Sequence, residues 1–176
     1  MKVMKWFLGA VVVLVVLLVG GGFLLPSDYR VERTAVIGAA PEKVFALIED
    51  PRQWARWTVW NRRDPAMKMT YSGAATGQGA RWSWASKTEG TGDMTFTLVQ
   101  APKRLEYALA FPDFGTASTG AIVLVPEGAG TRLTWSNQGD MGANPLMHWM
   151  AAAMDRMVGP DFEAGLAGLK ALAEKG

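Results

Sequence analysis

The stretch NPLMHWMAAAMDRMVGPDFEAGLAGLKALA, residues 144–173, decides the fold of this chain. Its apolar residues recur at steps of three and four, which places them on one face of a helix, with charged residues opposite. Asn144 followed by Pro145 is typical of a helix start, because the Asn side chain caps free N–H groups and Pro fits the first turn. Gly159 and Pro160 predict a kink or a brief opening near the middle. We therefore expect a long C-terminal helix around which a sheet wraps.

The N-terminus carries a second long apolar segment of a different kind. Trp6 to Leu25 is a run of twenty residues without a charge, preceded by Lys2 and Lys5. A helix of that length spans about 30 Å, the thickness of a membrane's hydrocarbon core. Basic residues before the span predict that residues 1–5 lie in the cytoplasm.

A cleaved signal peptide is the alternative for this segment, because Gly20 and Gly22 could serve a peptidase. We favour a retained transmembrane helix over residues 6–25, since the apolar run continues past those glycines and no Ala-x-Ala box is present. The sequence thus predicts a single-pass cell-membrane protein. Residues 28–176 would form one domain on the extracytoplasmic (periplasmic) side, large enough for its own core.

Composition narrows the classes of function. The chain has 18 basic and 16 acidic residues, and Lys2 and Lys5 account for the difference. The domain is therefore electrically balanced, which argues against a nucleic-acid partner. Cysteine is absent, which excludes disulfides and thiol chemistry, and the single His148 makes a Ser-His-Asp triad or a multi-His metal site a poor expectation. We expect no cofactor and no metal.

The pattern of the chain between these two segments predicts one strand, then short helices, then a series of strands. Asp28 to Ile37 alternates as a strand, Pro41 opens a short helix that ends at Asp50, and a second helix or turn covers 52–57. Six further segments show strand patterns separated by turn residues: 67–71, 82–84, 94–98, 105–111, 116–125 and 133–135. One long helix is then left to cover the apolar face of the sheet.

Four stretches carry a resemblance to a known family: Ala39–Trp54, Trp57–Trp60, Pro126–Trp135 and Met157–Leu166. With the order of elements, they resemble the helix-grip fold of the START-like or SRPBCC superfamily, which includes Bet v 1-like proteins, and in particular its polyketide cyclase/dehydrase and lipid-transport branch. The resemblance implies an α+β fold. In it a seven-stranded antiparallel sheet wraps around the C-terminal helix, with two short helices after the first strand. It also implies a cavity between sheet and helix.

If the sheet grips the helix, inward residues of both would line that cavity. The candidate lining residues are Phe45, Trp82, Trp84, Phe96, Tyr107, Leu109, Trp135, Met147, Met150, Met154 and Met157. Apolar, partly preformed cavities suit apolar ligands, and flexible Met side chains adapt to several shapes. The alternative is that these residues simply fill the core.

Three other features invite a functional interpretation. Trp54, Trp57 and Trp60, with arginines nearby, could form a lipid-facing patch, but we favour packing of the short helices against the sheet. His148 is expected to be a structural residue rather than a catalytic base. Asn137 could offer polar contacts, although nothing in the sequence marks it out.

Our first hypothesis is membrane-anchored, non-catalytic binding of a hydrophobic small molecule or lipid in the cavity. The second is a polyketide cyclase or aromatase-like enzyme, which would need inward polar groups. The third is an envelope module that binds another protein through the Trp/Arg patch. The sequence predicts no catalytic residues, leaves the ligand's identity open, and names no protein partner.

Overall fold

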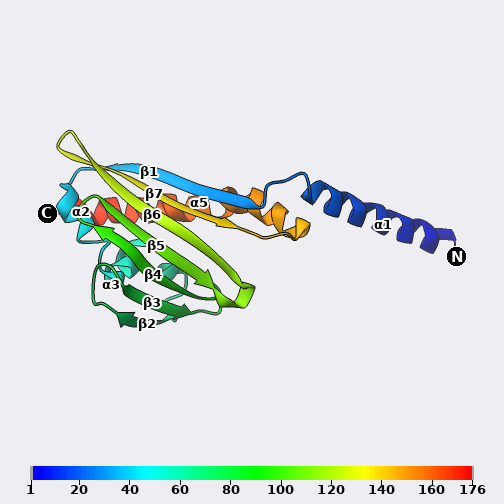
Figure 1. Ribbon diagram of the computed structural model, residues 1–176, viewed down its shortest axis with the longest axis horizontal. Helices are drawn as coiled ribbons and strands as arrows, with labels where there is room; N and C mark the ends of the chain where they lie inside the picture. The colour runs from blue at the N-terminus through cyan, green and yellow to red at the C-terminus, as the bar shows by residue number, and fades with distance from the viewer. Residues whose placement is uncertain (1, 176) are drawn as a thin grey trace.

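The computed structural model describes residues 2–175 and shows an α+β fold in which a curved sheet holds a long helix (Figure 1). The elements in chain order are α1 (Lys2–Gly22), β1 (Asp28–Ile37), α2 (Pro41–Phe45), α3 (Pro51–Trp57), α4 (Trp60–Arg63), β2 (Lys68–Gly73), β3 (Ala80–Ala85), β4 (Thr91–Gln100), β5 (Arg104–Phe111), a 3-10 turn (Pro112–Phe114), β6 (Thr116–Glu127), β7 (Gly130–Asp140) and α5 (Pro145–Ala173). The predicted helix-grip architecture is confirmed.

The sheet has seven antiparallel strands in the order β1-β7-β6-β5-β4-β3-β2. Consecutive strands from β2 to β7 are joined by hairpins, and β1 closes the sheet by pairing with β7. Opposed residues such as Arg33 and Trp135 share the inner face, against which α5 packs. The register shifts once in β4, between Phe96 and Leu98, which bends that strand toward the helix.

The connection from β1 to β2 contains three short helices, where the sequence predicted two. Asp50 caps α3 by accepting a hydrogen bond from the backbone N–H of Arg52, and Pro51 occupies the first turn. The additional helix, α4, has only four residues. A segment that short shows no helical periodicity, so the pattern could not reveal it.

α5 begins where predicted, with the side chain of Asn144 accepting from the N–H of Leu146 at 3.0 Å. It does not open at Pro160: the helix runs unbroken from Pro145 to Ala173, so of the predicted kink or opening the opening is wrong. Arg33 lies directly against Gly159, where a Cβ would sit 1.9 Å from its guanidinium. This arginine binds Asp155 and Glu163, on the turns before and after the proline, and so holds both parts of the helix together.

α1 is an exposed apolar helix that projects from the domain at the end where α5 begins (Figure 1). The predicted span was 6–25, whereas α1 begins at Lys2 and ends at Gly22. Phe23, Leu24 and Leu25 lie in the connection to β1. By length and composition it is able to cross a membrane. The C-terminus lies at the opposite end of the molecule.

Candidate ligand site

The interface between sheet and helix has a packed half, which we define as the part covered by residues 160–173 of α5. Phe162 stacks on Trp135 with ring centroids 3.9 Å apart and planes 10° from parallel. Trp54 and Trp57 of α3 add edge contacts to Trp135, at 5.8 and 5.3 Å. All four rings are nearly or wholly buried, so this half is a solid aromatic core.

The two tryptophans of α3, Trp54 and Trp57, are buried. Trp57 is 0% exposed and donates its indole N–H to the carbonyl of Leu47, while Trp54 donates to the carbonyl of Ile48. The interpretation that they pack the short helices against the sheet is confirmed. A lipid-facing or protein-binding patch centred on Trp57 is therefore wrong.

Five of the eleven candidate lining residues lie in the packed half, and they fill it. Phe45, Trp82, Phe96, Tyr107 and Trp135 are each at most 4% exposed. Trp54 lies at the centre of this group, with ring centroids 5.3 to 6.0 Å from those of Trp82, Phe96, Tyr107 and Trp135. Their place in the structure is that of core residues, which was the alternative interpretation for each.

The phenol of Tyr107 is the one buried ionisable group of this core. Its hydroxyl accepts from the indole N–H of Trp135 at 2.9 Å and donates to the carbonyl of Ser136 at 3.4 Å. Burial raises the pKa of Tyr107 to about 12, which keeps the phenol neutral at physiological pH. Its hydrogen bonds within the core make it a structural group.

The other half of the interface, the open half, lies under residues 145–158 of α5. Of the six remaining candidates, the four methionines lie on this part of α5, while Trp84 and Leu109 lie on the inner face of β3 and β5. Trp84, Leu109, Met147 and Met154 are half-buried, and Met150 and Met157 are 39% and 54% exposed. Met150 and Met157 are thus less covered than Met147 and Met154. The same helix therefore changes from buried to partly exposed apolar residues at its midpoint.

Aromatic rings lie flat on the inner face of the sheet in the open half. Trp84 lies over Gly92 on the neighbouring strand, where a Cβ would come within 2.2 Å of the indole. Tyr29 lies in the same way over Gly139, where a Cβ would be 2.7 Å from its hydroxyl. The absence of side chains at these glycines keeps the rings low against the sheet, so the inner face is flat and largely apolar at these two places.

One polar cluster interrupts this inner face. Asn137 and Ser118 are each 7% exposed, and the Asn137 amide donates to the Ser118 hydroxyl at 3.2 Å. The Tyr29 hydroxyl donates to the Asn137 carbonyl oxygen at 3.5 Å, a long contact. Ser118 pairs directly with Leu109 across the sheet, which places the cluster at the border of the open half. The sequence offered Asn137 only as a possible polar contact and did not point to Ser118 or Tyr29 as its partners, although Asn137 shares the alternation of Leu133 and Trp135.

Two arginines hold α5 at the boundary between the halves. Arg33 of β1 binds Asp155 at 2.7 Å and Glu163 at 2.6 Å. The hydrogen bonds to these carboxylates, chiefly that of Asp155, raise the pKa of Arg33, and Arg33 in turn lowers that of Asp155. These ion pairs fix the helix against β1.

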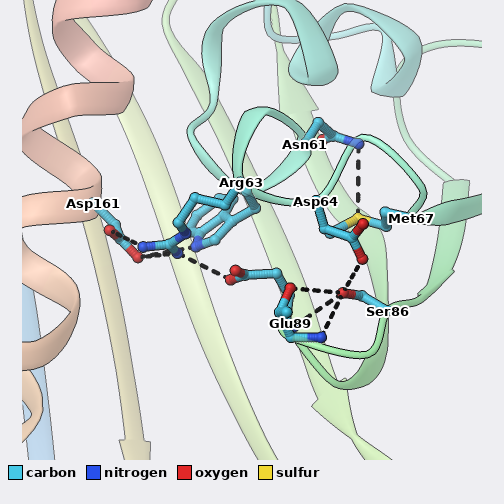
Figure 2. Close-up of polar contacts among 9 residues, drawn as sticks. Asn61, Arg63, Asp64, Met67, Ser86, Glu89 and Asp161 are labelled. Atoms are coloured by element: carbon cyan, nitrogen blue, oxygen red, sulfur yellow. Dashed lines mark hydrogen bonds and ion pairs between the residues drawn. The ribbon is translucent and has the colours of Figure 1, made fainter.

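The second clasp joins α4 and the β3–β4 hairpin to the other side of α5 (Figure 2). Arg63 donates to both carboxylate oxygens of Asp161, at 2.8 and 2.7 Å, and to Glu89 at 2.9 Å. Trp60 adds an indole hydrogen bond to Asp161. Because Asp161 follows Pro160, both clasps grip the helix at its midpoint and leave its first half attached mainly to β1 and α1.

Two surface hollows lie away from the sheet–helix interface. One, of about 350 Å³, is on the outer face of the sheet among small side chains such as Ala108, Ala110 and Ala117, and the other is on α1. The sheet–helix interface itself has a filled half and a partly exposed half. Within residues 2–175, no three His, Asp or Glu side chains are grouped as a metal site requires.

Comparison with known proteins agrees with this architecture. The family model described as polyketide cyclase / dehydrase and lipid transport matches residues 28–174. No curated protein sequence matches the chain.

Solved structures share the fold at low sequence identity. Protein CV1439 from Chromobacterium violaceum is 19% identical, with a TM-score of 0.60 over 85% of this chain and 99% of that one. The Aha1 dimer from Colwellia psychrerythraea is 18% identical, with a TM-score of 0.56 over 84% and 97%. The di-domain ARO/CYC StfQ of the steffimycin biosynthetic pathway is 14% identical, with a TM-score of 0.63 over 84% of this chain and 51% of that one.

Proposed function

The chain belongs to the polyketide cyclase/dehydrase and lipid transport family, and on that premise we propose that it binds a hydrophobic small molecule or lipid without catalysis. The site is the open half of the sheet–helix interface, and α1 anchors the protein in the cell membrane. The observation that carries the proposal is the change along α5, from fully buried apolar residues to half-buried and exposed ones above an inner sheet face that is flat and largely apolar at Trp84 and Tyr29.

The open half has the chemistry that an apolar ligand needs. Methionines supply flexible, polarizable contacts that follow the shape of a guest. Exposed apolar groups that gather on one face of a soluble domain mark binding surfaces. A ligand between Met154 and Leu109 would cover both residues and remove the cost of their partial exposure.

The polar cluster suggests one feature of the ligand. Asn137 has two donors and two acceptor lone pairs, and its partners within the protein are Ser118, Tyr29 and Tyr107, which leaves an acceptor lone pair for a ligand. Arg33, on the strand that pairs with that of Asn137, is bound to Asp155 and Glu163. A neutral hydroxyl therefore suits this site better than an ion, because an ion would need a free opposite charge there.

The anchor supports a ligand taken from a membrane. α1 is apolar from Trp6 onward, and Lys2 and Lys5 in its first turns are typical of a cytoplasmic start. Retention of α1 as a single span places residues 28–175 on the extracytoplasmic side. Apolar molecules concentrated in a bilayer are then the nearest source of ligand.

The test is to purify the full chain from membranes and to identify co-purifying compounds by mass spectrometry of the organic extract. Leu109→Arg places a charge in the open half and should abolish the enrichment of any apolar compound over bulk lipid. Val36→Arg makes the same kind of change on β1 at a 44% exposed residue of the outer face and should leave the enrichment unchanged. Equal enrichment in both variants, or none in the unmodified chain, contradicts the proposal.

A further inference from the structure

α1 is joined to the start of α5 by side-chain contacts, not only by the chain that follows it. The indole N–H of Trp149 donates to the backbone carbonyl of Leu18 at 2.9 Å. His148 is 9% exposed, and its Nδ1 lies 2.8 Å from the carbonyl oxygen of Gly22. Its Nε2 lies 2.9 Å from the carbonyl oxygen of Gly142, which fixes the ring between α1 and the loop before α5.

Two glycines make this contact close. A Cβ on Gly21 would lie 2.8 Å from the Trp149 ring, and one on Gly22 would lie 2.1 Å from the carbonyl oxygen of Pro145. The backbone of α1 thus touches the first turn of α5 directly. The orientation of the domain relative to α1 is set by this contact.

The outward side of the same junction is apolar. Leu146, Trp149 and Met150 of α5 are 49%, 44% and 39% exposed. Phe23 and Leu24, directly after α1, are 67% and 87% exposed. These five residues, which we call the junction patch, continue the apolar surface of α1 onto the domain.

The hydrogen bond from Trp149 fixes the depth of this patch. Leu18 lies within the apolar run that extends to Leu25, so its carbonyl would be at or below the edge of the hydrocarbon core when α1 spans a bilayer. A side chain bonded to that carbonyl must lie at the same level. Trp is the residue type that favours this boundary, where its ring is in lipid and its N–H finds an acceptor.

We propose that the junction patch is inserted in the interface of the bilayer that α1 spans, so that the open half of the ligand site faces the membrane surface. The proposal rests on the membrane anchoring proposed above, and its occupant is a lipid surface. A ligand then passes between bilayer and site without crossing bulk water.

Charge decides which lipids take part. Two ionisable residues next to the junction in the chain, Asp28 and Asp140, are acidic, whereas the following Arg30 is bound to Glu32. The backbone N–H of Met141, next to Asp140, bonds to the carbonyl of Ser27. A site built on acidic neighbours gains nothing from anionic headgroups. Insertion should therefore occur fully in vesicles of phosphatidylcholine alone.

The chain has no cysteine, so one introduced cysteine carries one environment-sensitive NBD label. Leu146→Cys reports on the junction patch and Val13→Cys on the centre of α1. Ala171→Cys, exposed at the far end of α5, is the matched control. Each full-length variant is reconstituted in phosphatidylcholine vesicles and tested with lipid-borne doxyl quenchers and with aqueous iodide.

The expected result is a blue-shifted emission at residues 13 and 146, strong quenching by doxyl lipid and protection from iodide, with the reverse at residue 171. Iodide quenching at 146 equal to that at 171, with 13 embedded, overturns the proposal and leaves the anchor intact. Protection of 146 from both quenchers shows a contact with a second copy and overturns it as well. Quenching of the label at residue 13 by iodide would show that α1 does not span the bilayer, and would contradict both the anchor and the junction-patch proposal. None of these quenching measurements uses a ligand. Ligand binding is therefore tested separately, by the extraction experiment.

Discussion

The two halves of the sheet–helix interface differ although one helix and one sheet form both. Both halves are rich in aromatic and apolar residues. In the packed half Phe162, Leu166 and Leu169 are at most 3% exposed, whereas in the open half Met150 and Met157 are 39% and 54% exposed. The difference teaches that apolar content does not by itself decide whether such an interface becomes core or binding surface.

The presence or absence of a helix between the sheet and α5 decides whether the interface is filled. In the packed half α3 inserts Trp54 and Trp57 between the sheet and α5, and these indoles meet Trp135 edge-on. The open half has α1 against the start of α5, but α1 lies outside the sheet. With no side chains of an intervening helix to complete the packing, its apolar residues stay partly exposed.

The largest effect should come from removing the centre of the packed half. Trp135→Ala removes the stack on Phe162 and leaves the buried Tyr107 hydroxyl without its donor. We expect the free energy of unfolding to fall by roughly 3–5 kcal/mol, the usual cost of deleting a large buried ring. Urea unfolding of the full chain in detergent measures it.

The matched change in the open half is Met157→Ala, which should alter stability by no more than about 0.5 kcal/mol, because this side chain is mostly exposed. Similar losses for the two variants would show that the division into halves has no energetic meaning.

A smaller effect should follow from adding one carbon to α5. Gly168→Ala would place a Cβ 2.4 Å from the backbone carbonyl oxygen of Trp57, so helix α3 must shift. We expect a loss of about 1–3 kcal/mol, typical of overpacking, although alanine is the better helix former. Thermal unfolding should show a lower midpoint than in the unmodified chain; an increase would mean that α3 yields freely and that the packed half is not tightly fixed.

The next effect concerns ligand preference in the open half. Asn137→Leu removes the amide at the polar cluster while keeping a side chain of similar size. Two probes that differ by one hydroxyl, 1-pyrenemethanol and 1-methylpyrene, are compared by fluorescence anisotropy. The preference for the hydroxylated probe should fall by about two- to tenfold, the value of one neutral hydrogen bond.

In that experiment the affinity for 1-methylpyrene serves as the control and should stay the same. An unchanged preference would remove Asn137 from the site while leaving the site itself in place.

The smallest effect is a pH dependence at the Arg33 clasp. Arg33 lowers the pKa of Asp155 below its ordinary value of 3.8, chiefly through their hydrogen bond. The stability from this pair is therefore complete above the ordinary pKa and is lost as the pH falls through the lowered one. Asp155→Asn should reduce the unfolding midpoint slightly at pH 7 and not at all at a pH where Asp155 is protonated. A reduction of equal size at both pH values would assign the effect to something other than the charge.

Much of the fold could be predicted from sequence because its signals are local. Asn144 and Pro145 marked the start of α5, and the alternation from Asp28 to Ile37 gave β1 its observed ends. The family resemblance supplied the single seven-stranded antiparallel sheet around the helix. The packing role of Trp54 and Trp57 was the interpretation favoured over a lipid-facing patch.

The remaining features depend on contacts between distant segments. Pro160 alone predicts a break, and only the position of Arg33, far away in β1, explains why the helix continues. Asn137, Ser118 and Tyr29 come from three strands and form a cluster only when the sheet is registered. Within α5, Phe162, Leu166 and Leu169 after Pro160 predict a packed half, and the methionines before it predict a half that borders a ligand. On the sheet, core and site candidates are residues of the same kinds, so the sequence could not separate them.

The most direct measurement of the central claim is hydrogen exchange along α5, in the full chain in lipid nanodiscs, with and without 1-methylpyrene. A ligand in the open half should slow exchange in residues 145–158 and in the facing segments of β5 and β7, and leave residues 160–173 unchanged. Equal protection along both halves of α5, or protection confined to residues 160–173, would contradict the account.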